Sequence, residues 1–231
     1  MKKRDSLYDN KIVHKPWGYE YTIFRYQNKL SITFLKINFN KKTSLHCHPK
    51  KKTGFILING KAKIQLGLWR SNSKNYSSPS KLMIREGLFH SIKSISKKGL
   101  IALEFETPVN KKDLVRYKDN YGRTSRPYEG KEYLKKMSSK FIIFKKPKLN
   151  KNQRYLIGSV EIYVELHSNF KKLVKEKMNT IFAVLYGEVV DKYGRNVLSS
   201  GDIIRTGTLK KLSEVYKIRK KLALIKVKNR V

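Results

Sequence analysis

The chain reads Thr43-Ser-Leu-His-Cys-His-Pro-Lys-Lys-Lys-Thr-Gly-Phe-Ile-Leu-Ile-Asn-Gly60 at its most informative stretch. Successive side chains of a strand point to opposite faces, so a strand here places His46 and His48 together and Cys47 opposite them. Asn59-Gly60 follows an apolar run, and this dipeptide is typical of a type I′ turn with a positive φ at both positions. The stretch therefore predicts a hairpin and two histidines on one strand face.

Strand-like sequence extends on both sides of this stretch, in short segments rich in β-branched and aromatic residues. In the first half these segments are Tyr19–Tyr26, Ser31–Phe39, Phe55–Ile58 and Leu100–Glu106. In the second half they are Phe141–Phe144, Tyr155–Leu166, Thr180–Asp191, Asp202–Arg205 and Leu222–Lys228. Many short strands at close spacing predict an all-β sandwich or barrel.

The two strand-rich halves share two landmarks, which indicates an internal repeat. Leu57-Ile-Asn-Gly60 parallels Val184-Leu-Tyr-Gly187, and Met83-Ile-Arg-Glu-Gly87 parallels Ile203-Ile-Arg-Thr-Gly207. Charged, turn-rich sequence separates the halves and contains a predicted short helix at Lys131–Ser138. We therefore predict an N-terminal barrel at 1–110, a connector at 111–139 and a degenerate second barrel at 140–231.

His90 is the candidate third ligand beside His46 and His48, because it follows an apolar strand in the same half of the chain. Imidazole is a common ligand of transition metals, and a third imidazole from another strand would fix the ion in place. His14 and His167 have no partner at metal-ligand spacing. The prediction is a divalent metal (Zn, Fe, Mn or Ni) at His46, His48 and His90.

Two segments of the first half resemble the two sequence motifs of the cupin superfamily. The matching positions are His46, His48, Gly60, Gly87 and His90. Thr53 stands where the first motif has a glutamate, so three of the four usual metal-ligand positions are filled. The resemblance implies double-stranded β-helix (jelly-roll) barrels in tandem, with the metal in the first barrel.

The resemblance is stronger to the cupin-type mannose-6-phosphate isomerases and related sugar-modifying cupins. Lys15-Pro-Trp-Gly-Tyr-Glu20 looks like their opening motif, and Asp113-Leu-Val-Arg-Tyr-Lys-Asp-Asn-Tyr-Gly-Arg123 looks like the segment after their last barrel strand. It implies a sugar substrate, and guanidinium groups bind phosphate bidentately. We therefore assign Thr53, Arg116 and Arg123 to substrate binding, although surface ion pairs are the common role of such arginines.

Glu104 is the candidate catalytic acid or base. Alternation along Leu100–Glu106 places Ala102, Glu104 and Glu106 on one face, and a carboxylate inside the barrel would be a metal ligand, a partner of one, or a general base. The other interpretation is a charge at the end of a strand in solvent. The predicted function is isomerisation or epimerisation of a phosphorylated or nucleotide-linked sugar in surface polysaccharide or glycan biosynthesis. The alternatives are a non-catalytic sugar- or polyanion-binding protein and an iron-dependent dioxygenase.

The composition limits partners and compartment. Against 17 Asp and Glu there are 53 Lys and Arg, a formal charge of +36 that would attract polyanions such as nucleic acid. The lysines are scattered, which favours compositional bias over a nucleic-acid module. The single cysteine, the absence of a long apolar run and a basic start without an apolar stretch behind it predict a cytoplasmic protein without a membrane span. A homodimer is a further expected partner.

Overall fold

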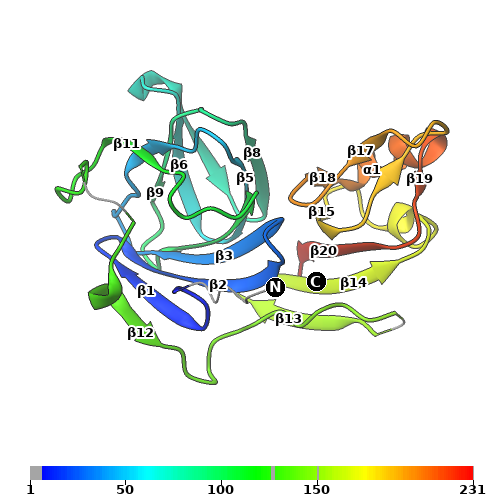
Figure 1. The fold of residues 1–231 in the computed structure, drawn as a ribbon, viewed down its shortest axis with the longest axis horizontal. Helices are drawn as coiled ribbons and strands as arrows, with labels where there is room; N and C mark the ends of the chain where they lie inside the picture. Colours follow the sequence, from blue (N-terminus) through cyan, green and yellow to red (C-terminus); the bar gives the residue numbers. More distant parts are fainter. Residues whose placement is uncertain (1–6, 126–127, 150, 231) are drawn as a thin grey trace.

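The computed structural model describes residues 7–125, 128–149 and 151–230, so the basic start lies outside the described residues. Strands dominate the secondary structure and form antiparallel sheets in two halves that lie side by side (Figure 1). The predicted all-β fold with jelly-roll barrels is confirmed. No helix within these ranges combines the length and the hydropathy that a bilayer crossing requires.

Two sheets form the N-terminal barrel. The larger has the order β12-β1-β2-β3-β10-β5-β8 and the smaller the order β11-β4-β9-β6-β7. The larger sheet contains β1 (Lys11–Lys15), β2 (Gly18–Tyr26), β3 (Leu30–Ile37), β5 (Lys52–Asn59), β8 (Ser80–Ile84), β10 (Leu100–Thr107) and β12 (Leu134–Lys136). The smaller contains β4 (Leu45–Cys47), β6 (Lys61–Leu66), β7 (Ser73–Ser77), β9 (His90–Ser94) and β11 (Val115–Lys118), and a 3-10 turn, η1 (Arg70–Asn72), precedes β7.

Two further sheets form the second half. The larger has the order β13-β14-β20-β15-β18 and the smaller the order β17-β16-β19. The larger contains β13 (Gln153–Ile157), β14 (Val160–His167), β15 (Ile181–Tyr186), β18 (Ile203–Arg205) and β20 (Leu222–Asn229). The smaller contains β16 (Val189–Val190), β17 (Asn196–Leu198) and β19 (Lys217–Ile218), and one helix, α1 (Thr206–Val215), lies between β18 and β19.

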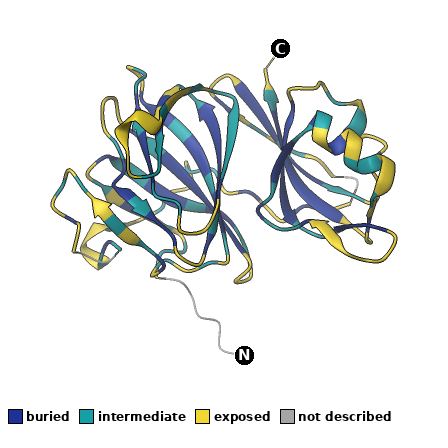
Figure 2. Cartoon of the chain, turned by 90° about the horizontal axis from the view of Figure 1, so that it is seen from above, coloured by how far each residue is buried: buried dark blue, intermediate teal, exposed yellow. Residues whose placement is uncertain are grey.

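Strand β5 shows how the larger sheet of the N-terminal barrel separates two cores. Phe55 and Leu57 point into the barrel and pack with Ile92 of the smaller sheet. Ile56 and Ile58 point the other way, into a core shared with the second half. The Phe-Ile-Leu-Ile run is apolar at every position because both faces of the strand are buried. Figure 2 shows buried strands, in dark blue, in both halves of the molecule.

The two halves repeat the same strand order. The series β2-β3-β10-β5-β8 corresponds to β13-β14-β20-β15-β18, and β7-β6-β9 corresponds to β17-β16-β19. Gly60 after β5 has φ +93° and Gly187 after β15 has φ +98°. A Cβ on either glycine would clash with the carbonyl oxygen just before the central strand, that of Gly99 or of Lys221. The landmark that suggested a repeat thus reflects the same close backbone approach in both halves.

The strand that carries His46 has no counterpart in the described second half. In the first half β4 lies between β3 and β5, whereas the chain between β14 and β15 forms a single 3-10 turn, η3 (Leu173–Lys175). In the pairing register Glu104 lies opposite Phe55, and the corresponding pair is Lys226 opposite Phe182. The repeat therefore keeps the sheets and replaces the polar residues.

The predicted hairpin at Asn59-Gly60 is wrong. Strand β5 pairs with β10 and β8, whereas β6 pairs with β7 and β9 in the other sheet. The turn therefore transfers the chain from one sheet to the other, and of its two residues only Gly60 has a positive φ. A barrel corner and a hairpin both need a glycine here, so the dipeptide alone does not distinguish them.

The helix predicted at Lys131–Ser138 is also wrong. The chain there forms a 3-10 turn, η2 (Lys131–Tyr133), followed by β12, which pairs with β1. An unpaired sheet edge offers backbone donors and acceptors, and strand pairing satisfies more of them than a short helix. The segment 111–139 predicted as a connector thus contributes β11 and β12 to the N-terminal sheets, while the boundaries at 110 and 140 stay a prediction.

Three segments of the second half differ from the predicted strands. Phe141–Phe144 forms no strand, and Phe144 instead packs its ring into the core between the halves. Tyr155–Leu166 is interrupted at Gly158, where φ is +59°, so that it forms the hairpin of β13 and β14. Helix α1 was not predicted, and its buried Leu209 joins the interior core of the second half. Aromatic content alone therefore overestimates strand length.

Candidate metal centre

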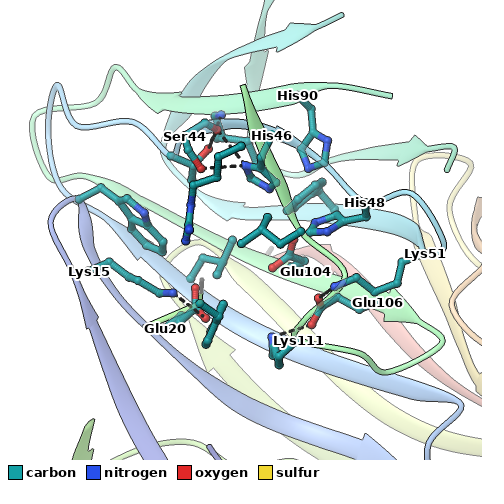
Figure 3. Close-up of a pocket in the computed structure, with 18 of the residues that line it drawn as sticks. Lys15, Glu20, Ser44, His46, His48, Lys51, His90, Glu104, Glu106 and Lys111 are labelled. Carbon is teal, nitrogen blue, oxygen red and sulfur yellow. Dashed lines mark hydrogen bonds and ion pairs between the residues drawn. The ribbon is translucent and has the colours of Figure 1, made fainter. Parts of the chain in front are cut away.

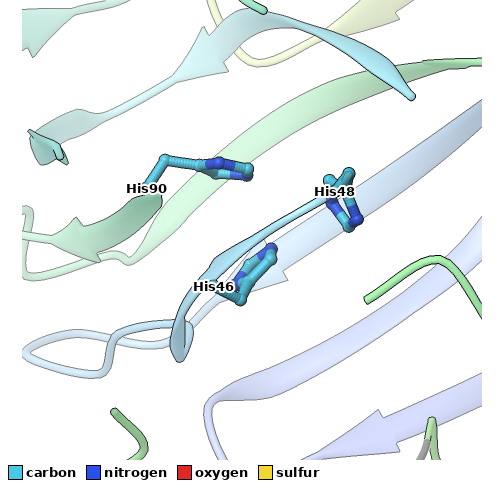
Figure 4. A group of neighbouring side chains, drawn as sticks. All are labelled: His46, His48 and His90. Atoms are coloured by element: carbon cyan, nitrogen blue, oxygen red, sulfur yellow. The ribbon is translucent and has the colours of Figure 1, made fainter. Parts of the chain in front are cut away.

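The three predicted histidines meet inside the N-terminal barrel. His46 on β4 lies directly opposite His90 on β9 in the strand register, and His48 follows the end of β4 on the same face. Their candidate ligand atoms all lie within 4.8 Å of one another (Figure 4). Among the described residues this is the one group of three or more His, Cys, Asp or Glu side chains with such spacing.

Backbone carbonyls fix the orientation of all three imidazoles. The Nδ1 atom of His46 lies 2.9 Å from the Ser44 carbonyl oxygen, that of His48 lies 2.6 Å from the Asp113 carbonyl oxygen, and that of His90 lies 3.0 Å from the Leu88 carbonyl oxygen. A carbonyl oxygen only accepts, so each Nδ1 carries the proton and donates it. Each Nε2 is then left with its lone pair free for a metal.

Burial keeps these rings neutral. It lowers the pKa of His46 well below its ordinary value, with help from the neighbouring His90 and His48. It lowers the pKa of His48 to about 3, with a contribution from Lys51, and the pKa of His90 to about 4. Only the neutral imidazole is a ligand, so the three rings are in the ligand-competent form at neutral pH.

A divalent ion fits the donor set. The Nε2 atoms of His48 and His90 are buried and have no hydrogen-bond partner among the described residues. A buried polar atom without a partner costs about 1–3 kcal/mol, which metal coordination would remove. Three imidazole nitrogens with an open fourth position are a known catalytic arrangement for zinc and suit iron, manganese and nickel as well.

Thr53 lies on β5, opposite Glu106 in the register with β10. Its hydroxyl oxygen is buried and has no hydrogen-bond partner among the described residues, and it does not line the cavity next to the histidines. The structure therefore gives the Thr53 hydroxyl no hydrogen bond to the three imidazoles. Its predicted role in substrate binding stays a prediction.

A cavity of about 70 Å³ adjoins the histidines and contains Glu104 and Glu106 in its wall (Figure 3). Burial, together with the neighbouring charge of Glu106, raises the pKa of Glu104 to about 8. The Glu104 side chain is therefore predominantly protonated at neutral pH and can donate a proton. The expectation that Glu104 faces the barrel interior agrees with this position.

Two lysines hold Glu106 in the ionised form. The Lys51 Nζ lies 2.5 Å and the Lys111 Nζ 2.7 Å from the two carboxylate oxygens of Glu106. Burial alone would raise the pKa of Glu106, but Lys111 and Lys51 lower it well below the ordinary value. Two neighbouring carboxyl groups in one cavity are thus held in different protonation states, which is typical of acid–base sites.

Removing one lysine from this cluster is expected to destabilise the protein. We expect Lys51→Met to lower the free energy of unfolding by about 3 kcal/mol, because the Glu106 charge loses one of its two buried partners. Lys50→Met, which changes an exposed neighbour, should cost less than about 0.5 kcal/mol. Urea unfolding at pH 7 measures both, and an equal loss in the two variants would contradict a paired, buried Lys51.

The two arginines predicted to bind phosphate line the same cavity. Arg123 is already engaged, because its Nη1 lies 2.6 Å from Glu129 and its Nη2 lies 2.8 Å from Asp119. The Arg116 Nη2 lies 3.8 Å from the same Glu129 carboxylate, which also binds Lys15. The structure thus brings both arginines to the site within an ion-pair network, and their phosphate role stays a prediction.

Sequence reasoning missed Lys51 and Lys111, although both are part of the cavity wall. Lys51 lies in a run of three lysines and Lys111 in a pair, and such runs are usually solvent-exposed. One signal was available: Glu106 shares a strand face with Glu104, and a second inward carboxylate needs a cation beside it. That signal does not say which of the many lysines supplies the cation.

Comparisons with solved structures find cupin-fold proteins at low identity. KdgF from a Halomonas species is 12% identical, with 42% of this chain and 84% of that chain covered and a TM-score of 0.37. A putative sugar phosphate isomerase from Acidithiobacillus ferrooxidans is 16% identical (35% and 51% covered, TM-score 0.32). The capsular polysaccharide assembling protein CapF from Staphylococcus aureus is 13% identical (47% and 34% covered, TM-score 0.41). The chain thus spans about half the length of that isomerase and a third of CapF.

A search of curated proteins finds no match. The family model described as the mannose-6-phosphate isomerase C-terminal domain matches residues 2–119. This is just over half of the 231 residues. The matched range includes the three histidines, Glu104, and the Lys51 and Lys111 that hold Glu106. The chain therefore belongs to the mannose-6-phosphate isomerase C-terminal family of the cupin superfamily.

Proposed function

We propose that the chain binds one divalent metal ion at His46, His48 and His90 and catalyses isomerisation or epimerisation of a phosphorylated or nucleotide-linked sugar. We place this reaction in surface polysaccharide or glycan biosynthesis. The observation that carries the proposal is the placement of three converging imidazoles beside the half-buried Glu104, whose pKa is raised, in one cavity. The family of sugar isomerases to which the chain belongs supports the substrate class.

The roles of the chain's own residues follow from their protonation states. A bound divalent ion would polarise a carbonyl or hydroxyl group of the sugar. Glu104 is protonated below about pH 8 and donates its proton to the carbonyl oxygen, and the resulting carboxylate takes the proton from the adjacent carbon. Glu104 then returns this proton to the former carbonyl carbon and takes the hydroxyl proton of the neighbouring carbon, which moves the carbonyl and restores the acid. Glu106 stays ionised between Lys51 and Lys111, and its negative charge adds to the effect of burial in keeping the Glu104 proton in place.

The size of the cavity limits what it encloses. A cavity of about 150 Å³ holds one benzene molecule, and the cavity at the histidines has about 70 Å³. Only the reacting end of a sugar fits beside the histidines. We place the rest of the substrate outside this enclosed volume. The single cysteine, Cys47, is buried and unpaired, which supports a cytoplasmic location.

Glu104→Gln tests the proposed reaction. We expect it to lower the turnover of phosphorylated aldoses and ketoses by about 100-fold or more, since general acid–base catalysis contributes this much, and to leave metal content unchanged. Turnover is measured by following isomer interconversion with NMR, and metal by mass spectrometry. Glu132→Gln, on an exposed glutamate of η2, is the control. Tight sugar binding without turnover in the unmutated protein would instead support a binding protein.

A further inference from the structure

A groove separate from the metal centre lies between the two halves. It has a volume of about 1050 Å³ and no residue in common with the cavity at the histidines. The β2–β3 turn, the end of β15 and the turn between β19 and β20 supply its wall. We call it the interbarrel groove and define it by Tyr26, Lys29, Tyr186, Arg219, Lys220 and Lys221. Ligand sites are common at such junctions between domains.

The interbarrel groove carries unbalanced positive charge. Arg219 is paired with Glu188, whose carboxylate lies 3.1 Å from the Arg219 Nη1. Within the described part of the chain no carboxylate pairs with Lys29, Lys220 or Lys221, and all three are exposed. The groove therefore presents three uncompensated ammonium groups, one from the first half and two from the second. These groups raise the positive electrostatic potential in the groove, in a chain whose net charge is already +36.

Lys220 occupies a backbone conformation that a glycine would adopt at lower cost. Its φ is +114°, outside the regions open to residues with a side chain. The corresponding turn of the first half, just before β10, takes its positive φ at Gly99. Strain of this kind concentrates at functional sites. The register position of Lys220 in the first half is Lys98, which has no positive φ, so the strain at Lys220 is particular to the second half and points to a role for this turn in the groove.

An aromatic pair lines the same groove. The rings of Tyr26 and Tyr186, one from each half, are stacked with centroids 4.6 Å apart. Both residues are half-buried, so part of their surface is open to a ligand in the groove. Aromatic rings beside a basic wall are the two elements of a site for single-stranded nucleic acid, where bases stack on the rings and phosphates follow the cations.

We propose that the interbarrel groove binds single-stranded nucleic acid without sequence preference. Phosphates lie along Lys29, Lys220 and Lys221, and a base packs on the exposed surface of the tyrosine pair. An acidic polysaccharide offers charges without planar aromatic rings, so its binding depends more on the lysines and less on the tyrosine rings than that of nucleic acid. This binding is independent of the metal centre and of the proposed sugar chemistry.

The test compares two double variants with the same change in charge. Lys220→Glu with Lys221→Glu alters the groove, whereas Lys97→Glu with Lys98→Glu alters the corresponding exposed turn of the first half, outside the groove. Binding of a fluorescently labelled oligothymidylate of fifteen nucleotides is measured by fluorescence anisotropy at about 100 mM salt. We expect the groove variant to bind about 10-fold more weakly and the control less than about twofold more weakly. Equal weakening in both variants would overturn the proposal, because the charge would then act diffusely.

Two single variants test the contributions of the Lys220 ammonium group and of the Tyr186 ring, and they distinguish nucleic acid from an acidic polysaccharide as the ligand. Lys220→Gly removes both the ammonium group and the backbone strain, so we expect a higher Tm together with weaker binding. Tyr186→Leu keeps an apolar side chain and removes the ring, and we expect about fivefold weaker binding with native circular dichroism. Unchanged affinity in Tyr186→Leu, together with displacement of the oligonucleotide by heparin at equal charge, would overturn nucleic acid in favour of an acidic polysaccharide.

Discussion

His46→Ala is expected to reduce bound divalent metal from about one ion per chain to less than about a tenth of that. The variant removes one of three imidazole ligands, and the two that remain leave a four-coordinate ion with as many positions open to water as are filled by protein. Loss of a group that merely orients a ligand already costs about 10–100-fold in affinity, so loss of a ligand should cost more. Inductively coupled plasma mass spectrometry of protein purified without chelators measures the content.

His167→Ala is the matched control for this experiment. Like the three cluster histidines, His167 has a hydrogen-bonded ring, because its Nε2 lies 3.0 Å from a Glu165 carboxylate oxygen in the second half. It is outside the cluster of His46, His48 and His90, so its replacement should leave metal content unchanged. Equal metal loss in both variants, or metal retained in His46→Ala, would contradict the site.

The second large effect is the loss of folding stability of the metal-free protein as the pH falls. The pKa of His48 is lowered to about 3 and that of His90 to about 4, and the pKa of His46 is lowered well below its ordinary value. An unfolded chain binds protons on these residues near pH 6.5, and the folded chain does not. The stability contributed by each histidine is therefore complete above pH 6.5 and decreases as the pH falls toward the folded pKa.

The expected magnitude is about 2 kcal/mol per histidine between pH 7 and pH 5. Glu104 acts in the opposite direction, because its raised pKa favours the folded state as the pH falls from about 8. Comparing variants therefore isolates the histidines. We expect His90→Gln, measured by urea unfolding in the presence of a chelator, to be about 2 kcal/mol less sensitive to the change from pH 7 to pH 5 than the unmutated protein. An identical pH dependence would show that His90 titrates normally in the folded state.

Strand alternation and motif spacing predicted which histidines meet in the candidate site. They did not predict the backbone groups that orient these histidines. The shared face of His46 and His48, and the arrival of His90 from another strand, follow from strand periodicity and the cupin motifs. The carbonyls of Ser44, Asp113 and Leu88 that orient the rings belong to turns whose path depends on the complete barrel. Backbone acceptors carry no residue-type signal, so no sequence pattern identifies them.

The fold was predictable where strands are buried on both faces and less so at the sheet edges. Segments such as Leu100–Glu106 agree with β10 within one residue, because the apolar run is dictated by two cores. At Asn59-Gly60 the turn residue was identified and its partner strands were not, since pairing is decided by contacts far apart in the sequence. The same reason explains β12, whose partner β1 is more than 100 residues earlier.

The second half shows what the fold becomes without a metal site. Lys226, at the register position of Glu104, is held by Glu165 at 2.9 Å and by Glu176 at 2.6 Å. An ammonium group therefore supplies a fixed positive charge inside this barrel, in a half that has no strand equivalent to β4 among its described residues. The charge of Lys226 is compensated within this half by Glu165 and Glu176.

The most direct test of the central claim is anomalous diffraction from crystals grown with a divalent transition metal. The account predicts one peak inside the N-terminal barrel at about 2.0–2.2 Å from the Nε2 atoms of His46, His48 and His90, with each Nδ1 still bonded to its carbonyl. A metal ion coordinated by Nδ1 would contradict it, as would a metal ion elsewhere in the chain. Crystals that contain the metal but show no anomalous peak at the three histidines would contradict it as well.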